Sequence, residues 1–190
     1  VNHLKSKGSA CFEDYPDYLT ADPLDGQGHC NALRVSAARV LGERLKGVSG
    51  DLLLIGDLNA YGMEDPIRVL TDYDPAAQSR QIMSASFTTL AGQPFEESGS
   101  ALGKGYGLVN LNTRFHGTDT YSYSYEGELG NLDHALANPS IAAKVIGIED
   151  WHINSAESNF FEYGSKYTGQ LAKSDGPFSA SDHDPVLVAI

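Results

Sequence analysis

The feature that most constrains the fold is a short apolar run between two acidic turn residues. Residues 51–57 read Asp-Leu-Leu-Leu-Ile-Gly-Asp. A run of this length and character predicts a strand that is buried on both faces. Such a strand needs cover on each side, so the rest of the chain must supply layers of helix or sheet around it.

Two helices are expected next to that strand. Residues 31–46 predict a helix that ends before Gly47, with one apolar face made of Leu33, Ala37, Val40, Leu41 and Leu45. Residues 64–70 predict a short helix that tolerates Pro66 in its first turn. Residues 78–90 are compatible with a third helix, whereas residues 91–105 are rich in glycine and serine and predict a loop.

The remaining strands are predicted mainly in the second half of the chain. Tyrosine and serine alternate over residues 121–125, which predicts a strand with its tyrosines on one face. Residues 126–130 are expected to turn and residues 131–137 to return as the second arm of a hairpin. Further strands are predicted within 144–153 and 184–190. Together these elements predict an α/β (α+β) fold, a two-sheet sandwich flanked by helices, and 190 residues suit one domain.

The charge balance limits the classes of partner. The chain has 13 basic and 25 acidic side chains, a net charge of −12. This excludes a generally basic surface for binding nucleic acid. No apolar run approaches the roughly 20 residues of a membrane-spanning helix, so no membrane span is expected. A polyphosphate partner would therefore depend on a divalent metal ion.

Cys11 and Cys30 are the only cysteines, and they flank a polar stretch of a long loop over residues 4–29. A disulfide between them would stabilise this loop by about 3 kcal/mol and would indicate an oxidising compartment. The alternative is two unpaired cysteines in a reducing compartment. The acidic residues within 14–25 could also hold a structural Ca²⁺, although they lack EF-hand spacing.

The first candidate functional segment is Gly56-Asp57-Leu58-Asn59, at the carboxyl end of the predicted buried strand. Open sheets place their sites at such ends. On an extended backbone, Asp57 and Asn59 would point the same way and offer a charged and a neutral oxygen ligand, which suits Mg²⁺. The alternative is that Asp-x-Asn merely forms a turn.

Two further segments combine aspartate with histidine. Asp133 and His134 open a predicted strand, and an aspartate beside an imidazole fixes its tautomer and stabilises its charged form. Ser181-Asp182-His183-Asp184-Pro185 precedes the last strand, where one side chain could bind metal while its neighbour meets substrate. Each segment alone is equally compatible with a capped turn and a surface histidine.

Taken in order, the Gly-Asp-Leu-Asn, Leu-Asp-His and Ser-Asp-His-Asp-Pro segments resemble the endonuclease/exonuclease/phosphatase superfamily, which includes deoxyribonuclease-like enzymes. The segments Val-Asn-His-Leu-Lys-Ser-Lys-Gly at residues 1–8 and Gly-Asp-Leu-Asn-Ala-Tyr-Gly-Met-Glu-Asp-Pro-Ile at 56–67 resemble its secreted bacterial nucleases. The resemblance covers most of the chain and is weakest over 72–115.

The resemblance implies a role for each matching residue. It implies that His3 contacts the scissile phosphate, that Asp57 activates water, and that His183 is a general base paired with Asp133. It implies that the metal-binding residues include Asp182, with contributions from Asp57 and Asn59. Substrate contacts are expected from Asn59, Arg34 and Tyr61. Arg34 is equally compatible with a solvated helix charge, Tyr61 with loop packing, and the 121–125 tyrosines with sheet packing rather than base stacking.

The resemblance also implies the function and its setting. It implies metal-dependent hydrolysis of phosphodiesters in DNA, with RNA as a second substrate, using Mg²⁺ or Mn²⁺ and with Ca²⁺ as a further candidate, by an extracellular protein. In the family an amino-terminal half supplies an Asn and a Glu ligand, so residues 1–190 are expected to be the C-terminal portion of one such domain. The alternatives are a phosphodiesterase or phosphatase acting on lipids or small phosphate esters, and a non-catalytic Ca²⁺-binding or interaction module.

Overall fold

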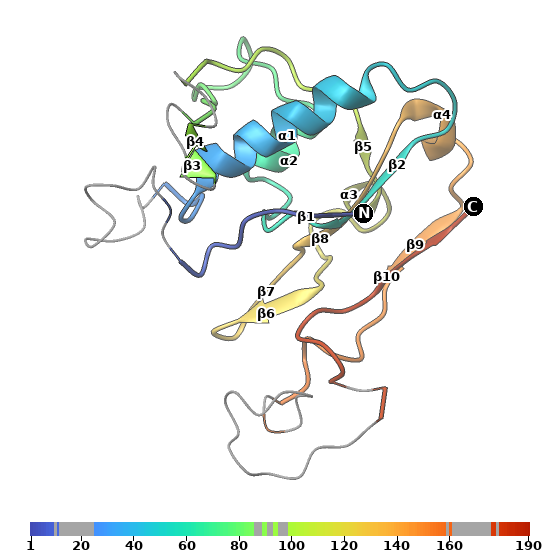
Figure 1. Ribbon diagram of the computed structural model, residues 1–190. Coiled ribbons are helices and arrows are strands. Elements are labelled where there is room, and N and C mark those ends of the chain that lie inside the picture. Colours follow the sequence, from blue (N-terminus) through green and yellow to red (C-terminus); the bar gives the residue numbers. More distant parts are fainter. Residues whose placement is uncertain are drawn as a thin grey trace.

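The fold is seen in a computed structural model that describes residues 1–9, 11, 25–85, 89–90, 93–94, 99–158, 160, 176–177 and 179–190 (Figure 1). Within these residues the chain forms one four-stranded sheet, three two-stranded sheets and four helices. The predicted mixture of helices and strands is therefore confirmed as a mixed α+β architecture.

The central sheet is built around β2 (Leu53–Asp57), the strand predicted from the apolar run. Its neighbours are β1 (Asn2–His3), which runs parallel to it, and β8 (Asp133–Ala137), which runs antiparallel. β5 (Val109–Asn110) completes the sheet on the far side of β8. The register places His3 beside Asp57 and Asp57 opposite Asp133.

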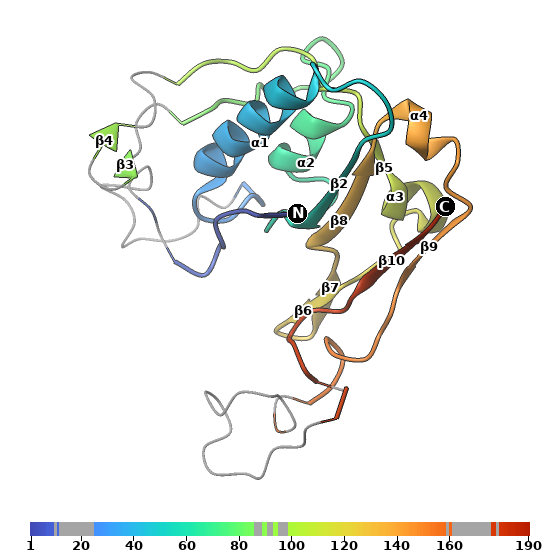
Figure 2. The same ribbon diagram turned by 45° about the vertical axis from the view of Figure 1, so that its right-hand side comes forward.

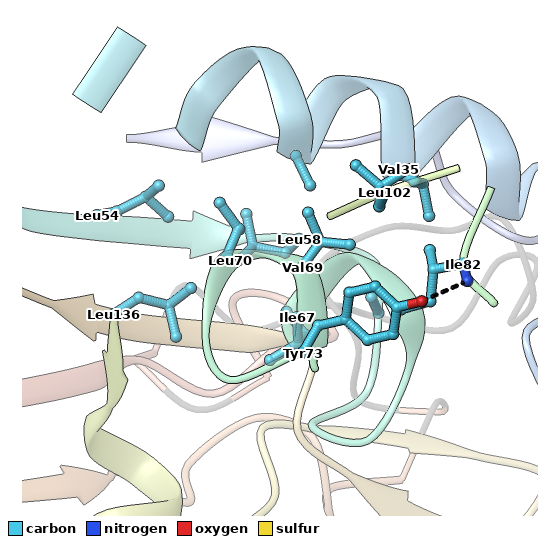
Figure 3. Close-up of a cluster of buried hydrophobic side chains, with 12 residues drawn as sticks. Val35, Leu54, Leu58, Ile67, Val69, Leu70, Tyr73, Ile82, Leu102 and Leu136 are labelled. Carbon is cyan, nitrogen blue, oxygen red and sulfur yellow. Dashed lines mark hydrogen bonds between the residues drawn. The ribbon is translucent and has the colours of Figure 1, made fainter. Parts of the chain in front are cut away.

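Two helices cover one face of this sheet, α1 (Asn31–Leu45) and α2 (Asp65–Leu70) (Figures 1 and 2). Their apolar side chains pack with those of β2 and β8 in the main core (Figure 3). The Tyr73 hydroxyl lies within this core and accepts a hydrogen bond from the backbone N–H of Ile82 at 3.0 Å. The largest buried members of the core are Val35, Leu54, Leu58, Ile67, Val69, Leu70, Tyr73, Ile82, Leu102 and Leu136.

The opposite face of the central sheet is covered by different elements. β9 (Gly147–Asp150) and β10 (Val186–Ala189) form an antiparallel pair on the side away from α1 and α2 (Figure 2). α3 (Leu111–His116) and α4 (Pro139–Ala142) accompany this pair. A second core joins these elements to β8, with buried members Leu111, Ala135, Ala137, Ile141, Ala142, Val145 and Ile148. β8 is thus buried on both faces, whereas β2 packs Leu54 in the main core and leaves Ile55 36% exposed on its other face. The predicted burial of the 51–57 strand on both faces is therefore met only in part.

Helix α1 buries a face that only partly matches the one predicted: Leu41 and Leu45 pack against the main core as expected. Val35 and Ala38 are fully buried in the core, whereas Val40 is 41% exposed. Arg34 is also fully buried and uses its guanidinium to bond nearby backbone carbonyls. Gly42 sits on the same face, where the ring of Tyr106 lies against it.

The region around residues 121–137 also folds differently from the prediction. β6 (Tyr123–Tyr125) pairs with β7 (Glu128–Gly130), and the turn between them is Glu126-Gly127, both at positive φ (51° and 86°). This is the geometry of a two-residue hairpin turn. The predicted second arm, residues 131–137, instead supplies β8 to the central sheet, where it pairs with β2 and has side chains buried on both faces.

Four other predictions concern the 78–90 helix, the cysteine pair, the acidic loop residues and a membrane span. Residues 78–85 are not helical, and residues 86–88 lie outside the described residues; β3 (Thr89–Leu90) and β4 (Gln93–Pro94) form a small hairpin there. Cys11 and Cys30 lie at disulfide distance with their Cα atoms 5.6 Å apart. The acidic residues considered as Ca²⁺ ligands are outside the described residues apart from Asp25. Among the helices described, none has the length and apolar character to cross a bilayer.

Gly42 provides a test of the α1 packing. A Cβ atom at this position would lie 2.2 Å from the Tyr106 ring, so Gly42→Ala should lower the free energy of unfolding by about 1–3 kcal/mol, despite the higher helix propensity of alanine. The control is Gly47→Ala, since a Cβ there meets nothing within 4 Å. Urea denaturation of both variants checks this, and equal stability of the two would contradict the described packing.

Candidate functional site

The candidate site lies at one end of the central sheet, where three neighbouring strands present polar side chains. His3 ends β1, Asp57 ends β2 and Asp133 begins β8, and the register aligns all three. Residues directly opposite one another on adjacent strands point to the same face of a sheet. The sheet therefore places an imidazole and two carboxylates side by side, and the His3 Nε2 lies 3.3 Å from an Asp57 oxygen.

Glycine at position 56 allows β1 to approach this end of the sheet. Gly56 has φ of 133°, and a Cβ atom there would lie 1.9 Å from the backbone oxygen of Asn2. A side chain at this position would push β1 away and carry His3 with it. The Gly-Asp pair of the sequence motif thus has a steric reason in addition to a chemical one.

The sequence predicted that Asp57 and Asn59 point the same way along an extended strand, and this prediction is wrong. Asn59 has a positive φ of 46° and belongs to a turn. Its backbone N–H donates to Asp57 Oδ1 at 2.7 Å, and its side-chain Nδ2 donates to Asp57 Oδ2 at 2.9 Å. The same Nδ2 donates to the Leu4 carbonyl at 3.0 Å. Asn59 therefore orients the Asp57 carboxylate and ties β1 to the turn; the turn chemistry considered for this motif is present together with the carboxylate site.

The second histidine of the site comes from the far end of the chain. His183 Nδ1 lies 2.7 Å from Asp133 Oδ2. The same oxygen accepts a hydrogen bond from the Ser122 hydroxyl at 2.7 Å, and Ser122 Oγ accepts from the backbone N–H of Asp133 at 3.1 Å. Because a carboxylate only accepts, the Nδ1 of His183 carries the proton, and in the neutral ring Nε2 keeps its lone pair.

These side chains form a compact acidic group. Ligand atoms of Asp57, Asp133 and His183 all lie within 4.8 Å of one another. Burial raises the pKa of Asp57. The nearby charge of Asp133 raises it further, whereas the hydrogen bond from the Asn59 backbone N–H lowers it. Burial alone would lower the pKa of His183, but the hydrogen bond and charge of Asp133 outweigh it, so the pKa of His183 is raised. Two close carboxylates under these conditions favour a divalent cation or a proton between them.

A groove of about 880 Å³ opens onto this group. Its lining includes Lys7, Gly28, His29, Tyr123, Tyr125 and Asp182. Glu64 lies in the groove and accepts from Lys7 Nζ at 2.6 Å and from the Tyr61 backbone N–H at 3.1 Å. The groove has room for more than a small phosphate ester, and its acidic side chains outnumber its lysine.

Of the remaining predicted site residues, Asp182 and Tyr61 line the groove. Asp182 is exposed and lines the groove, but among the described residues the three-membered acidic and histidine group is formed without it. Tyr61 lines the groove with the Lys7 Nζ 3.9 Å from its ring centroid, and a Cβ at Gly130 would lie 2.4 Å from the same ring. Tyr61 therefore both packs against the hairpin and faces the groove.

Arg34 is not placed to bind substrate, contrary to the prediction. It is fully buried, and its guanidinium donates to the backbone carbonyls of Gln27 at 2.8 Å, His29 at 2.7 Å and Lys5 at 3.1 Å. The loops it joins run beside the groove and have irregular backbones whose carbonyls need donors. Arg34 thus supports one side of the groove from behind.

Two functional supports were missed by sequence reasoning. Ser122, fully buried, orients Asp133 through its hydroxyl; its alternation with Tyr121 and Tyr123 was the available signal that it points inward. His134 is 2% exposed, and its Nε2 donates to the Ala60 carbonyl at 2.8 Å. It points away from Asp133 and holds the turn that follows Asp57, a role that no local pattern indicates.

Comparison of the chain with protein-family models, with curated proteins and with solved structures gives no match.

Metal binding can be tested at the two opposed carboxylates. Asp57→Asn and Asp133→Asn should each weaken Mn²⁺ binding by about tenfold or more, because each removes a charged oxygen ligand. Asp182→Asn is the matched control and should stay within about threefold, because this carboxylate is outside the compact group. Titration followed by the electron paramagnetic resonance of free Mn²⁺ measures the affinities; an Asp182→Asn loss as large as that of Asp133→Asn would place the ion elsewhere.

The buried His134 predicts a pH dependence of stability. Burial lowers the pKa of His134 to about 4 from its ordinary 6.5. The unfolded chain takes up this proton at higher pH than the folded chain does. The free energy of unfolding should therefore fall as the pH drops from 6.5 to 4, by up to about 3 kcal/mol.

His134→Gln should flatten that part of the stability curve, because glutamine does not titrate. His116→Gln, at an exposed histidine, is the control and should keep the slope. Urea denaturation at pH values between about 4 and 7.5 measures both, and an unchanged slope in His134→Gln would contradict the prediction.

Proposed function

We propose that this chain hydrolyses phosphodiester bonds in nucleic acid, with DNA as the main substrate, using a divalent metal ion held at the end of the central sheet. The observation that carries the proposal is the compact group of Asp57, Asp133 and His183 at the base of a groove. It supplies two carboxylates for a cation and one oriented imidazole for proton transfer. These are the parts that phosphodiester hydrolysis near neutral pH requires.

The residues present fit a small divalent cation. Asp57 and Asp133 lie opposite one another in register, and the pKa of Asp57 is raised by burial and by its neighbour. Like charges opposite one another destabilise a sheet unless a counter-charge compensates them. Mg²⁺ or Mn²⁺ bound by these carboxylates would stabilise negative charge that develops on the phosphate.

The side chains of the chain itself account for positioning and proton transfer. Asp133 holds His183 through Nδ1, which leaves Nε2 to take a proton from water or to return one to the leaving oxygen. The pKa of His183 is raised mainly by Asp133, against the effect of burial. His3, whose side chain is 76% exposed, lies beside Asp57 and can donate to a phosphate oxygen from the groove.

The resemblance to the endonuclease/exonuclease/phosphatase superfamily supports the same proposal. Its deoxyribonuclease-like sandwich is compatible with the layered α+β arrangement, with helices on one face of the central sheet and a second sheet on the other. We also infer an extracellular location, supported by the Cys11–Cys30 pair. Under this proposal an Asn and a Glu ligand would come from a preceding segment of the same domain.

Nicking of supercoiled plasmid by the purified chain tests the function. Nicking should require Mg²⁺ or Mn²⁺ and stop with a chelator. His183→Ala should reduce the rate by about 10²–10⁴-fold because it removes the proton carrier, and Asp57→Ala should reduce it at least as much. Lys144→Ala is the control, since Lys144 pairs with Asp51 on the surface outside the groove lining.

The outcomes separate the alternatives. A folded chain that binds Mn²⁺ but does not nick plasmid should gain activity when a preceding segment with the two further ligands is supplied. Continued absence of nicking would contradict the nuclease proposal and leave a non-catalytic metal-binding module. Hydrolysis of a small phosphate ester without nicking would favour a phosphatase or phosphodiesterase instead.

A further inference from the structure

The residue that follows His183 has surroundings quite unlike those of its neighbours. Asp184 is 3% exposed, whereas the nearby Asp182 and Pro185 are exposed. It lies two residues before the last strand, β10, and does not line the groove. A buried carboxylate outside the compact acidic group needs a reason of its own, because burying a charge costs free energy unless hydrogen bonds compensate.

The Asp184 carboxylate is satisfied by a single loop, residues 152–155. Its Oδ1 accepts from three successive backbone N–H groups, those of Ile153 at 3.1 Å, Asn154 at 2.8 Å and Ser155 at 3.0 Å. Its Oδ2 accepts from the Ser155 hydroxyl and lies 2.9 Å from His152 Nδ1. Three convergent N–H groups form an anion-binding nest, here filled by a side chain of the same chain.

The loop held by Asp184 in turn holds the backbone around His183. Asn154 Nδ2 donates to the His183 carbonyl at 2.7 Å, and Asn154 Oδ1 accepts from the Ala180 N–H at 3.1 Å. The Asp184 N–H donates to the Ser122 carbonyl at 2.8 Å. Ser122 is also the residue whose hydroxyl orients Asp133. The backbone bearing His183 is thus joined both to the loop and to the segment that supports its carboxylate partner.

We propose that Asp184 is a positioning residue for His183: its carboxylate holds the 152–155 loop against the His183 backbone and so sets the bond between His183 Nδ1 and Asp133. The kinetic part of this inference rests on the proposed function, whereas the geometric part does not. A carboxylate with a purely structural role would stabilise the fold without affecting that one bond.

Asp184→Asn tests the inference with little change in shape. The substitution removes the charge and replaces one acceptor oxygen by an NH₂ group that cannot accept from the loop. Asp150→Asn is the matched control. Asp150 is another buried carboxylate with side-chain donors, Asn112, Thr120 and Asn131, but it does not bond the 152–155 loop or the His183 backbone.

The first measurement is the downfield ¹H NMR signal of the His183 Nδ1 proton, assigned by its absence in His183→Gln. Asp184→Asn should lose this signal or shift it upfield, whereas folded Asp150→Asn should keep it. If Asp184→Asn does not fold, Ser155→Ala, which removes one donor to Asp184, should weaken the same signal. An unchanged signal in a folded Asp184→Asn variant would overturn the inference. If Asp184→Asn does not fold, an unchanged signal in Ser155→Ala would overturn it.

The second measurement is hydrolysis of an oligonucleotide duplex carrying a fluorophore and a quencher, with Mn²⁺ present. Asp184→Asn should lower kcat by about 10–100-fold while KM changes by less than about threefold, because misplacing His183 affects proton transfer rather than binding. Asp150→Asn should keep both within about threefold. Loss of the NMR signal in Asp184→Asn, with no hydrolysis by any variant even when a preceding segment with the two further ligands is supplied, would refute the proposed function alone. Hydrolysis with a normal signal and kcat in Asp184→Asn would refute the positioning role alone.

Discussion

The pairing of β2 with β8 places Asp57 directly opposite Asp133, and the arrangement of the site depends on this register. Carboxylates opposite one another on an antiparallel pair repel, and partial burial strengthens the repulsion. A shift of one residue would turn one of the two side chains to the other face and bury it in a core. The apolar residues of the two strands that pack in the main and second cores therefore hold an unfavourable charge pair in place.

Several polar side chains orient this pair without taking part in it. Asn59 bonds both oxygens of Asp57, and Ser122 bonds Asp133. Behind them, His134 holds the turn after Asp57 through the Ala60 carbonyl, and Arg34 holds the loops beside the groove. Each is buried because its donors satisfy backbone or side-chain acceptors that would otherwise lose water without compensation. Their hydrogen bonds fix the geometry of the site and are made to the protein itself.

The acidic character of the groove shapes the proposed activity. Its one lysine among the described lining residues is paired with Glu64 at 2.6 Å, while Asp57, Asp133 and Asp182 line the same space. A polyanion would be repelled by such a surface unless a divalent cation compensates it. The net charge of −12 acts in the same direction at longer range. Binding of a nucleic acid here would therefore depend on the metal more strongly than in a basic protein.

The sequence by itself determined the local elements and the types of chemistry available. The strand at 53–57, the helix at 31–45 and the short helix at 65–70 follow from apolar spacing and turn residues, because these are local properties of the backbone and side chains. It also identified Asp57, Asp133 and His183, since acid–base residues next to strand ends are visible as motifs.

Only the tertiary structure decided which residues meet and which are buried. Residues 131–137 pair with β2 rather than with the tyrosine strand. The contact of His183 with Asp133 across 50 residues was implied by the family resemblance, but no local pattern indicates it. Arg34 was predicted at the substrate and lies in the interior, while Asp182 lies at the groove but outside the compact group. Strand register and side-chain burial depend on partners distant in the chain, and a local pattern contains no information on which partner removes a given side chain from water.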